Sequence, residues 1–208
     1  MLIDAGAGIS AAPDRIEAAA IAAEADGYDG FNVPETRHDP FVCATLAARA
    51  TERISLRSSI AVAFARNPMN VAVLANDLQL ISGGRFQLGL GSQVRPHIER
   101  RYSMPWNHPA ARMEEFIAAV RAIWNSWATG ERLAFRGSFY HHTLMTDFLN
   151  SSRVFNSPRC VAAARAVCED RAHGRALALP ASVVARARPP QRALGRSRNP
   201  VRRQCRRV

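Results

Sequence analysis

The chain has 208 residues, enough for one large domain or two small ones, and its 48% of apolar residues can form a substantial core. The formal net charge of +11 is unevenly distributed, because residues 1–150 carry −1 and residues 151–208 carry +12 from 14 arginines and two acidic residues. No apolar run is long enough to span a membrane, and no basic region precedes the first apolar segment, so neither a membrane protein nor a secreted protein is indicated. The cysteines lack metal-ligand spacing, so a cysteine metal site is not indicated either. We expect a cytoplasmic location.

The start of the chain predicts two strand–helix units. We expect strands over residues 1–5 and 30–35, because each is a short apolar run bounded by turn residues. Helices are expected over 13–27 and 40–51, since each would begin with proline, which suits the first helical position. Asp39 precedes the second proline and is expected to cap that helix with its carboxylate.

Two further units follow. Residues 54–64 alternate between apolar and other side chains and are rich in β-branched residues, which predicts a third strand. Asn67 is expected to cap a helix over 68–82 that ends before two glycines. Residues 86–90 are a continuous apolar run and predict the fourth strand.

After a polar loop, the sequence predicts its longest helix and then a hairpin. The helix would begin at Pro109 and end near Gly130, with an apolar stripe that we interpret as core packing. Residues 132–135 and 138–142 predict the hairpin. Strands that alternate with helices predict an α/β fold with a parallel sheet, either an open doubly wound sheet or part of a closed barrel. The lengths of the connections do not distinguish these two architectures.

The stretch from the fourth strand into its loop is the best candidate for a ligand-binding edge. The strand ends in Gly91 and Ser92, and a glycine lets a flat ring or a phosphate approach the backbone closely. The following loop carries His97, Glu99 and two arginines at 100–101. The alternative interpretation is an ordinary strand-to-loop turn followed by solvated charges.

Four segments together resemble the luciferase-like monooxygenase family, and more narrowly the branch that uses the deazaflavin coenzyme F420. They are RHDPF at 37–41, ARNP at 65–68, DLQLISGGRFQLGLGSQ at 77–93 and RPHIERRYSMPWNHPAARMEE at 95–115. The resemblance covers about residues 1–150 and implies a (β/α)8 TIM barrel, of which the four units here would be half. It also implies hydride transfer between the deazaflavin, or FMN as the alternative cofactor, and a small organic substrate.

The resemblance further implies the residues of the site. His38, in the loop after the second strand, would be the catalytic proton donor or acceptor beside the cofactor ring. Residues 59–63 match the region where the family often holds a non-prolyl cis peptide against the ring. The residues expected to contact the cofactor, by backbone or side chain, are Ser59, Ile60, Ala61, Val62, Gly89, Gly91, Ser92 and Gln93.

Residues 151–208 depart from the family pattern. They show neither strand alternation nor capped helices beyond a weak stretch at 159–179, and we interpret them as a tail of low order that results from a shifted reading frame. The rival interpretation is a genuine basic arm that binds nucleic acid through its phosphates or binds an acidic surface, without an enzymatic activity. Half a barrel would leave half the cofactor site unbuilt and its strand edges open to a second copy, so we expect weak or absent cofactor binding.

The competing enzymatic hypothesis is an NAD(P)-binding dehydrogenase domain of the Rossmann type. Gly6, Gly8 and Ala11 form a GxGxxA pattern after the first strand, and Glu35 ends the second strand where an acid could bind a ribose. Against it, the proline at position 13 delays the helix, so the helix N-terminus would not point at a pyrophosphate held by those glycines.

Overall fold

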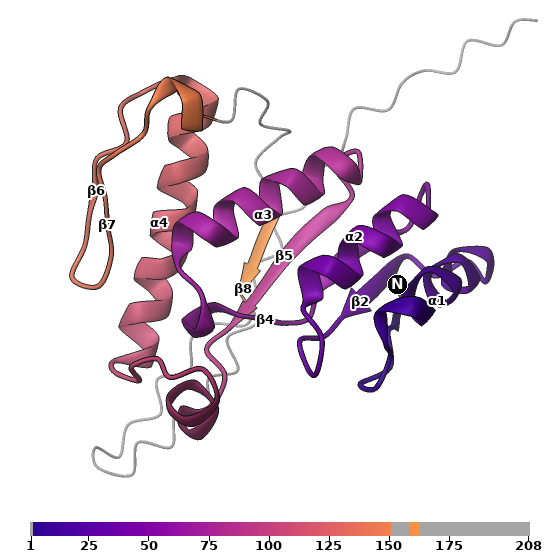
Figure 1. Ribbon diagram of the computed structural model, residues 1–208. Helices are drawn as coiled ribbons and strands as arrows, with labels where there is room; N and C mark the ends of the chain where they lie inside the picture. Colours follow the sequence, from indigo (N-terminus) through magenta and orange to yellow (C-terminus); the bar gives the residue numbers. More distant parts are fainter. Residues whose placement is uncertain (1, 151–158, 163–208) are drawn as a thin grey trace, which may run out of the picture.

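The part of the chain that the computed structural model describes, residues 2–150 and 159–162, is built on a six-stranded parallel sheet (Figure 1). Its strands are β1 (Asp4–Gly6), β2 (Gly30–Val33), β3 (Ser55–Ser58), β4 (Ala61–Val62), β5 (Phe86–Gly91) and β8 (Arg159–Ala162). The helices are α1 (Pro13–Ala25), α2 (Pro40–Ala50), α3 (Pro68–Ile81) and α4 (Pro109–Thr129), and a hairpin of β6 (Phe135–Arg136) and β7 (His141–His142) follows. None of the described helices is long and apolar enough to cross a membrane.

The helix boundaries follow the capping signals of the sequence. The Asp39 carboxylate accepts hydrogen bonds from the backbone N–H groups of Phe41 at 2.8 Å and Val42 at 3.3 Å, at the start of α2. The Asn67 side chain accepts one from the N–H of Asn70 at 2.9 Å, at the start of α3. Gly130 ends α4 with φ of 74°, a left-handed conformation that glycine adopts at little cost. The predicted caps at Asp39 and Asn67 are confirmed.

The order of the strands decides between the two architectures that the sequence left open. Strands β1, β2, β3 and β5 lie side by side in chain order and all run parallel. Successive helices pack against one another in the same order, α1 on α2, α2 on α3 and α3 on α4, as Figure 1 shows. A doubly wound sheet reverses its strand order and so places helices on both faces. The unreversed order is the winding of a barrel wall, so the prediction of a partial TIM barrel is confirmed.

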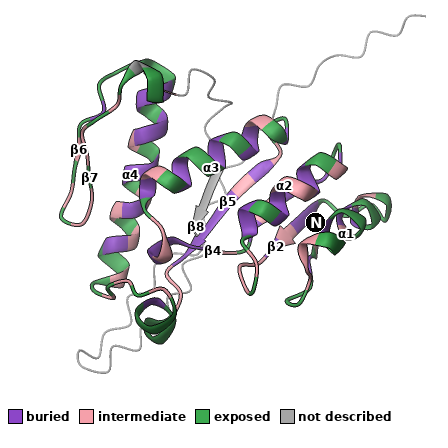
Figure 2. Cartoon of the chain, viewed as in Figure 1, coloured by how far each residue is buried: buried purple, intermediate pink, exposed green. Residues whose placement is uncertain are grey.

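The hydrophobic core lies between the sheet and its helices, and each helix in Figure 2 is buried along one side and exposed along the other. Trp124 of α4 is 2% exposed, and its indole N–H donates to the carbonyl of Ala72 in α3 at 3.0 Å. The fully or nearly fully buried members from strands and helices are Ile16, Phe31, Leu56, Val71, Phe86, Leu88, Leu90, Val120 and Ile123. This apolar layer fixes how the helices sit on the sheet, and thereby where the strand ends lie.

Two strand predictions were wrong. The single strand expected over residues 54–64 is two strands, β3 and β4, with a cis peptide bond between Ser59 and Ile60 and a 3₁₀ turn over Ala63–Ala65. Both β3 and β4 pair with the same edge of β5, at its beginning and its end respectively. The strand period alone could not show this break, since Ala61, Val62, Ala63 and Phe64 are all buried.

The other difference lies beyond residue 150. The structure places β8 (Arg159–Ala162) parallel to β5, on the edge opposite β3, within the segment expected to lack strands. The fourth barrel strand therefore has a partner on both edges, and its outer edge is not open as expected. The remaining predictions about residues 151–158 and 163–208, the shifted reading frame and the nucleic-acid-binding arm among them, lie outside the described residues.

A carboxylate secures the opposite, N-terminal end of the sheet. Glu24, near the end of α1, accepts hydrogen bonds from the backbone N–H groups of Glu52, Arg53 and Ile54, just before β3, at 2.6–3.2 Å. Burial alone would raise the pKa of Glu24, but the three N–H donors outweigh it and hold the pKa below its usual value. These hydrogen bonds stabilise the fold, and they lie at the end of the sheet away from the predicted site.

Candidate functional site

The two backbone segments predicted to face a cofactor meet at the carboxyl ends of the strands, at the lower end of the sheet in Figure 1. Ala61 pairs with Leu90 and Val62 pairs with Gly91, so the structure brings residues 59–62 and 89–93 together. The loops after β2, β4 and β5 leave the sheet at this same edge, which we call the carboxyl edge. In parallel α/β folds this edge is where ligands bind.

Glycine is required at the end of β5. A Cβ atom on Gly91 would lie 2.9 Å from the Cδ1 and Cγ1 atoms of Ile60, closer than side chains approach one another. Nearby, the hydroxyl of Ser58 accepts from the N–H of Gly89 and donates to its carbonyl, each at 2.9 Å. The Ser58 side chain thus ties the end of β3 to the backbone of β5, and the Ile60 side chain packs closely against Gly91.

The polar side chains that follow Gly91 turn back to their own loop. The hydroxyl of Ser92 donates to the carbonyl of Gln93 at 3.2 Å, and the Gln93 side-chain oxygen accepts from the N–H of Val94 at 3.1 Å. Gln93 has φ of 64°, so the chain turns sharply here. The side chains of Ser92 and Gln93 therefore stabilise the turn. The contacts predicted between this loop and a cofactor would then be made by the backbone of the loop and by the NH₂ group of the Gln93 amide.

His38 lies half-buried at the carboxyl edge, in the loop between β2 and α2. Among the described residues, no hydrogen bond or ion pair engages its imidazole. The next residue, Asp39, both caps α2 and pairs with Arg66 at 2.7 Å. The loop that carries His38 is thus fixed in place while the imidazole itself is left available for chemistry.

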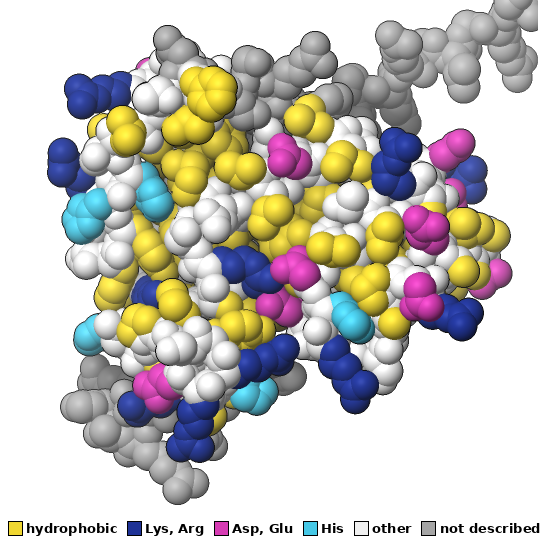
Figure 3. Space-filling model, viewed as in Figure 1, with side chains coloured by type: hydrophobic (Ala, Val, Ile, Leu, Met, Phe, Trp, Pro, Cys, Tyr) yellow, Lys and Arg dark blue, Asp and Glu magenta, His cyan; other side chains and the backbone are white. Residues whose placement is uncertain are grey.

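A buried carboxylate joins the three loops of the carboxyl edge. The Glu35 side chain, 6% exposed, accepts from the Val62 N–H at 2.7 Å and from the Arg66 guanidinium at 2.7 Å through Oε2. Its other oxygen, Oε1, accepts from the Tyr102 hydroxyl at 3.1 Å. We call Glu35, Asp39, Arg66 and Tyr102 the carboxyl-edge network. Figure 3 shows basic, acidic and histidine side chains side by side on the lower part of this face.

The charges in the network support one another. Burial alone would lower the pKa of Arg66, but the carboxylates of Glu35 and Asp39 outweigh it and raise the pKa above its ordinary value. Burial, and after it the Glu35 carboxylate, raises the pKa of Tyr102, so its phenol stays protonated and donates. Arg66 also lies over the ring of Phe41, 5.4 Å from its centroid.

The dehydrogenase hypothesis is wrong for two reasons. Among the described strands, the order does not reverse next to β1, so these strands do not form the switch-point crevice that binds a dinucleotide. Glu35, the acid proposed to bind a ribose, has both oxygens engaged by Val62, Arg66 and Tyr102. Its carboxylate is thus committed to holding loops of the carboxyl edge together, and at most one of its acceptor sites remains for any other donor.

Sequence reasoning missed Arg66 and Tyr102 as members of the site. Both lie within segments that carry the family resemblance, ARNP at 65–68 and the loop at 95–115. Neither segment shows which acid its polar side chain would meet, because Glu35 is 31 residues from Arg66 and 67 residues from Tyr102 along the chain. Only the fold brings these three residues together.

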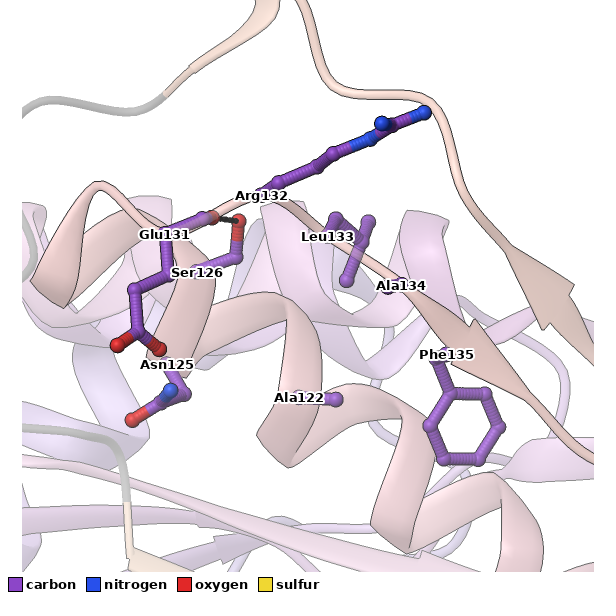
Figure 4. Close-up of a pocket in the computed structure, with 8 residues that line it drawn as sticks. All are labelled: Ala122, Asn125, Ser126, Glu131, Arg132, Leu133, Ala134 and Phe135. Carbon is purple, nitrogen blue, oxygen red and sulfur yellow. Dashed lines mark hydrogen bonds between the residues drawn. The ribbon is translucent and has the colours of Figure 1, made fainter.

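A hollow elsewhere on the surface does not contribute to this site. It has a volume of about 220 Å³ and lies between the end of α4 and the segment that leads into β6 (Figure 4). Its lining residues are Ala122, Asn125, Ser126, Glu131, Arg132, Leu133, Ala134 and Phe135, and the Ser126 hydroxyl within it donates to the Glu131 carbonyl at 2.7 Å. Within the described part of the chain, no group of three or more His, Cys, Asp or Glu side chains could hold a metal ion.

Comparison with protein families identifies relatives of the chain. The family model described as luciferase-like monooxygenase matches residues 2–187. An uncharacterized protein of Mycobacterium tuberculosis is 53% identical over 151 residues, which cover 72% of this chain and 44% of the relative. The chain thus spans about half the length of the curated relatives it matches.

Solved structures share the fold at low sequence identity. The oxygenating constituent of 3,6-diketocamphane monooxygenase from Pseudomonas putida, in complex with FMN, matches with a TM-score of 0.61 and 16% identity, over 76% of this chain and 49% of that one. The coenzyme F420 dependent tetrahydromethanopterin reductase of Methanopyrus kandleri matches with a TM-score of 0.53 and 22% identity, over 67% of this chain and 43% of that one.

Substituting Gly91→Ala tests the close approach at the carboxyl edge. Since the added methyl group would meet the Ile60 side chain, we expect the free energy of unfolding to fall by about 1–3 kcal/mol. Gly8→Ala is the matched control, because a Cβ there meets nothing within 4 Å. Urea unfolding of both variants checks the prediction. Equal stability of the two variants would show that Ile60 moves aside freely.

Proposed function

The chain belongs to the luciferase-like monooxygenase family, and from that premise we propose that its carboxyl edge is half of a site for coenzyme F420, at which a hydride passes to a small organic substrate. The observation that carries the proposal is the juxtaposition of residues 59–62 with 89–93 at the ends of parallel strands. His38 lies at the same edge. FMN is the alternative cofactor.

The residues at the carboxyl edge fit a flat ring. The strand ends there are built from small residues and backbone, with Ser59 exposed, Ala61 buried and Gly91 without a side chain. Two of the charges nearest to them, Glu35 and Arg66, neutralise each other in a buried pair. A ring whose face is largely apolar can therefore lie against this edge without stripping water from an unpaired charge.

Arginines on the rim of the edge favour an anionic cofactor. Arg37, Arg100 and Arg101 are exposed, and Arg101 donates to the carbonyl of Thr36 at 2.8 Å, so the loops that carry them adjoin. Coenzyme F420 has a phosphate and glutamate carboxylates in its side chain, whereas FMN has a phosphate alone. Arginine recognises both kinds of anion well.

The role of His38 is to exchange a proton at the reacting end of the substrate. When bound, the reduced deazaflavin supplies a hydride. For a carbonyl or quinone acceptor, His38 would give a proton to the oxygen as the carbon framework gains the hydride, so that the acceptor gains two electrons and two hydrogens in all. An imidazole suits this task because its ordinary pKa lies near neutrality.

A titration tests the proposed cofactor. We expect added protein to quench the fluorescence of dilute F420 with a dissociation constant weaker than about 10 μM, because the residues described here build only part of a barrel site. A parallel FMN titration should bind more weakly still. Tighter binding of FMN would reverse the assignment of the cofactor, and binding of neither would overturn the proposed function. A dissociation constant near 1 μM would contradict the expected impairment.

A substitution tests the proton role. With reduced F420 and the quinone menadione as the probe acceptor, His38→Asn should slow quinone reduction at least about 100-fold while F420 affinity changes less than about twofold. His141→Asn, on the exposed strand of the hairpin, is the control and should react at the native rate. Native-like turnover by the His38 variant would contradict the assignment.

A further inference from the structure

We propose that Glu35 is the positioning residue of the carboxyl edge: its carboxylate holds the loops after β2, β4 and β5 in one arrangement and so sets the backbone of residues 60–62 against the ring. The identity of the ring rests on the proposed function. The holding of the loops rests on contacts within the chain alone, and it can be tested with no cofactor present.

Glu35 makes hydrogen bonds to the backbone of residues 60–62 on both sides of Ala61. Its own N–H donates to the carbonyl of Ile60 at 3.2 Å, and its Oε2 accepts from the N–H of Val62 at 2.7 Å. Because one residue holds the peptide groups on both sides of Ala61, the position and the orientation of the backbone at Ala61 are both fixed. Both partners lie among the residues predicted to contact the cofactor.

The same carboxylate reaches the loop after β5. Tyr102 follows the π-turn His97–Arg101, and its hydroxyl donates to Glu35 Oε1 at 3.1 Å. No other side-chain hydrogen bond among the described residues joins Tyr102 to the loop after β2. One other side-chain hydrogen bond joins these two loops, from Arg101 to the carbonyl of Thr36 at 2.8 Å, but it does not reach residues 60–62. Glu35 is the link that connects the loop after β5 to Ile60 and Val62.

Arg66 connects Glu35 to the loop that carries His38. Its guanidinium donates to Glu35 Oε2 and Asp39 Oδ2, each at 2.7 Å, and to the Val62 carbonyl at 3.1 Å. Asp39 follows His38 directly. A shift of Glu35 would therefore pass to the imidazole through two short charge-assisted hydrogen bonds.

Both oxygens of Glu35 must accept. A carboxylate offers two acceptor oxygens, and Glu35 uses them for three donors, from Val62, Arg66 and Tyr102. Glu35→Ala removes both oxygens at once, whereas in Glu35→Gln the amide could turn its NH₂ group to the hydroxyl of Tyr102, which can also accept. Because the side chain is 6% exposed, water cannot readily replace the lost partner.

Hydrogen–deuterium exchange of the full chain tests the inference. Glu35→Ala should raise amide exchange at least about tenfold in both 59–66 and 97–106 and leave 52–54 unchanged, since a lost hydrogen bond of about 1.4 kcal/mol changes opening tenfold. Glu24→Ala is the matched control, because Glu24 is a carboxylate that also accepts from three donors, all of them backbone N–H groups, at the opposite end of the sheet. It should raise exchange in 52–54 only.

A second variant and a second measurement complete the test. Tyr102→Phe removes one donor, and we expect it to raise exchange in 97–106 and not in 59–66. In the F420 fluorescence titration, Glu35→Ala should bind at least about tenfold more weakly and Glu24→Ala within twofold of the native chain.

Each outcome decides a separate claim. Unchanged exchange in 59–66 and 97–106 of Glu35→Ala would overturn the inference whatever the cofactor. Raised exchange there with unchanged F420 affinity would show that the held loops do not position the ring, and would also overturn it. Failure of the native chain to bind F420 or FMN would overturn the proposed function, while the exchange data alone would still confirm or refute the holding role of Glu35.

Discussion

The buried ion pair between Glu35 and Arg66 is the interaction on which the candidate site depends. Removing one partner of such a pair typically costs about 3–5 kcal/mol, because the other charge remains buried without compensation. Here the pair also links the backbone of Val62 to Asp39 and Tyr102, which come from different loops. Loss of the pair would therefore change the positions of these loops relative to one another more than it would change the packing of the core between sheet and helices.

The winding of the chain explains why these loops meet. Strands laid down in order, all parallel, place every carboxyl end at the same edge, and the helices between them can pack only as a single layer over one face. The other face carries a row of polar side chains, in which Arg57 pairs with Asp4 and donates to Gln87 at 2.9 Å. In a closed barrel, such a row would lie inside and would be covered by the remaining strands.

Local signals made the elements predictable, whereas long-range contacts did not leave a signal. Asp39 and Asn67 each stand immediately before a proline, so the cap and the proline together predict where α2 and α3 begin. The break between β3 and β4 could not, because buried apolar residues continue through it. Glu35 is visible in the sequence as an acid at a strand end, but its partners come from segments far along the chain. The sequence therefore suggests a role for it only within the competing dehydrogenase hypothesis, as a ribose-binding acid.

The proposed function requires a cofactor ring at the carboxyl edge, against residues 60–62 and 89–93. The most direct test is a titration of the ¹⁵N-labelled chain with F420, followed through the backbone amide signals. If the ring lies there, the largest shifts will fall on Ala61, Val62, Gly91 and Ser92, with smaller ones at His38. The signals of the hollow beside Leu133 will stay unchanged. Shifts concentrated at that hollow, with the carboxyl edge unaffected, would contradict the account.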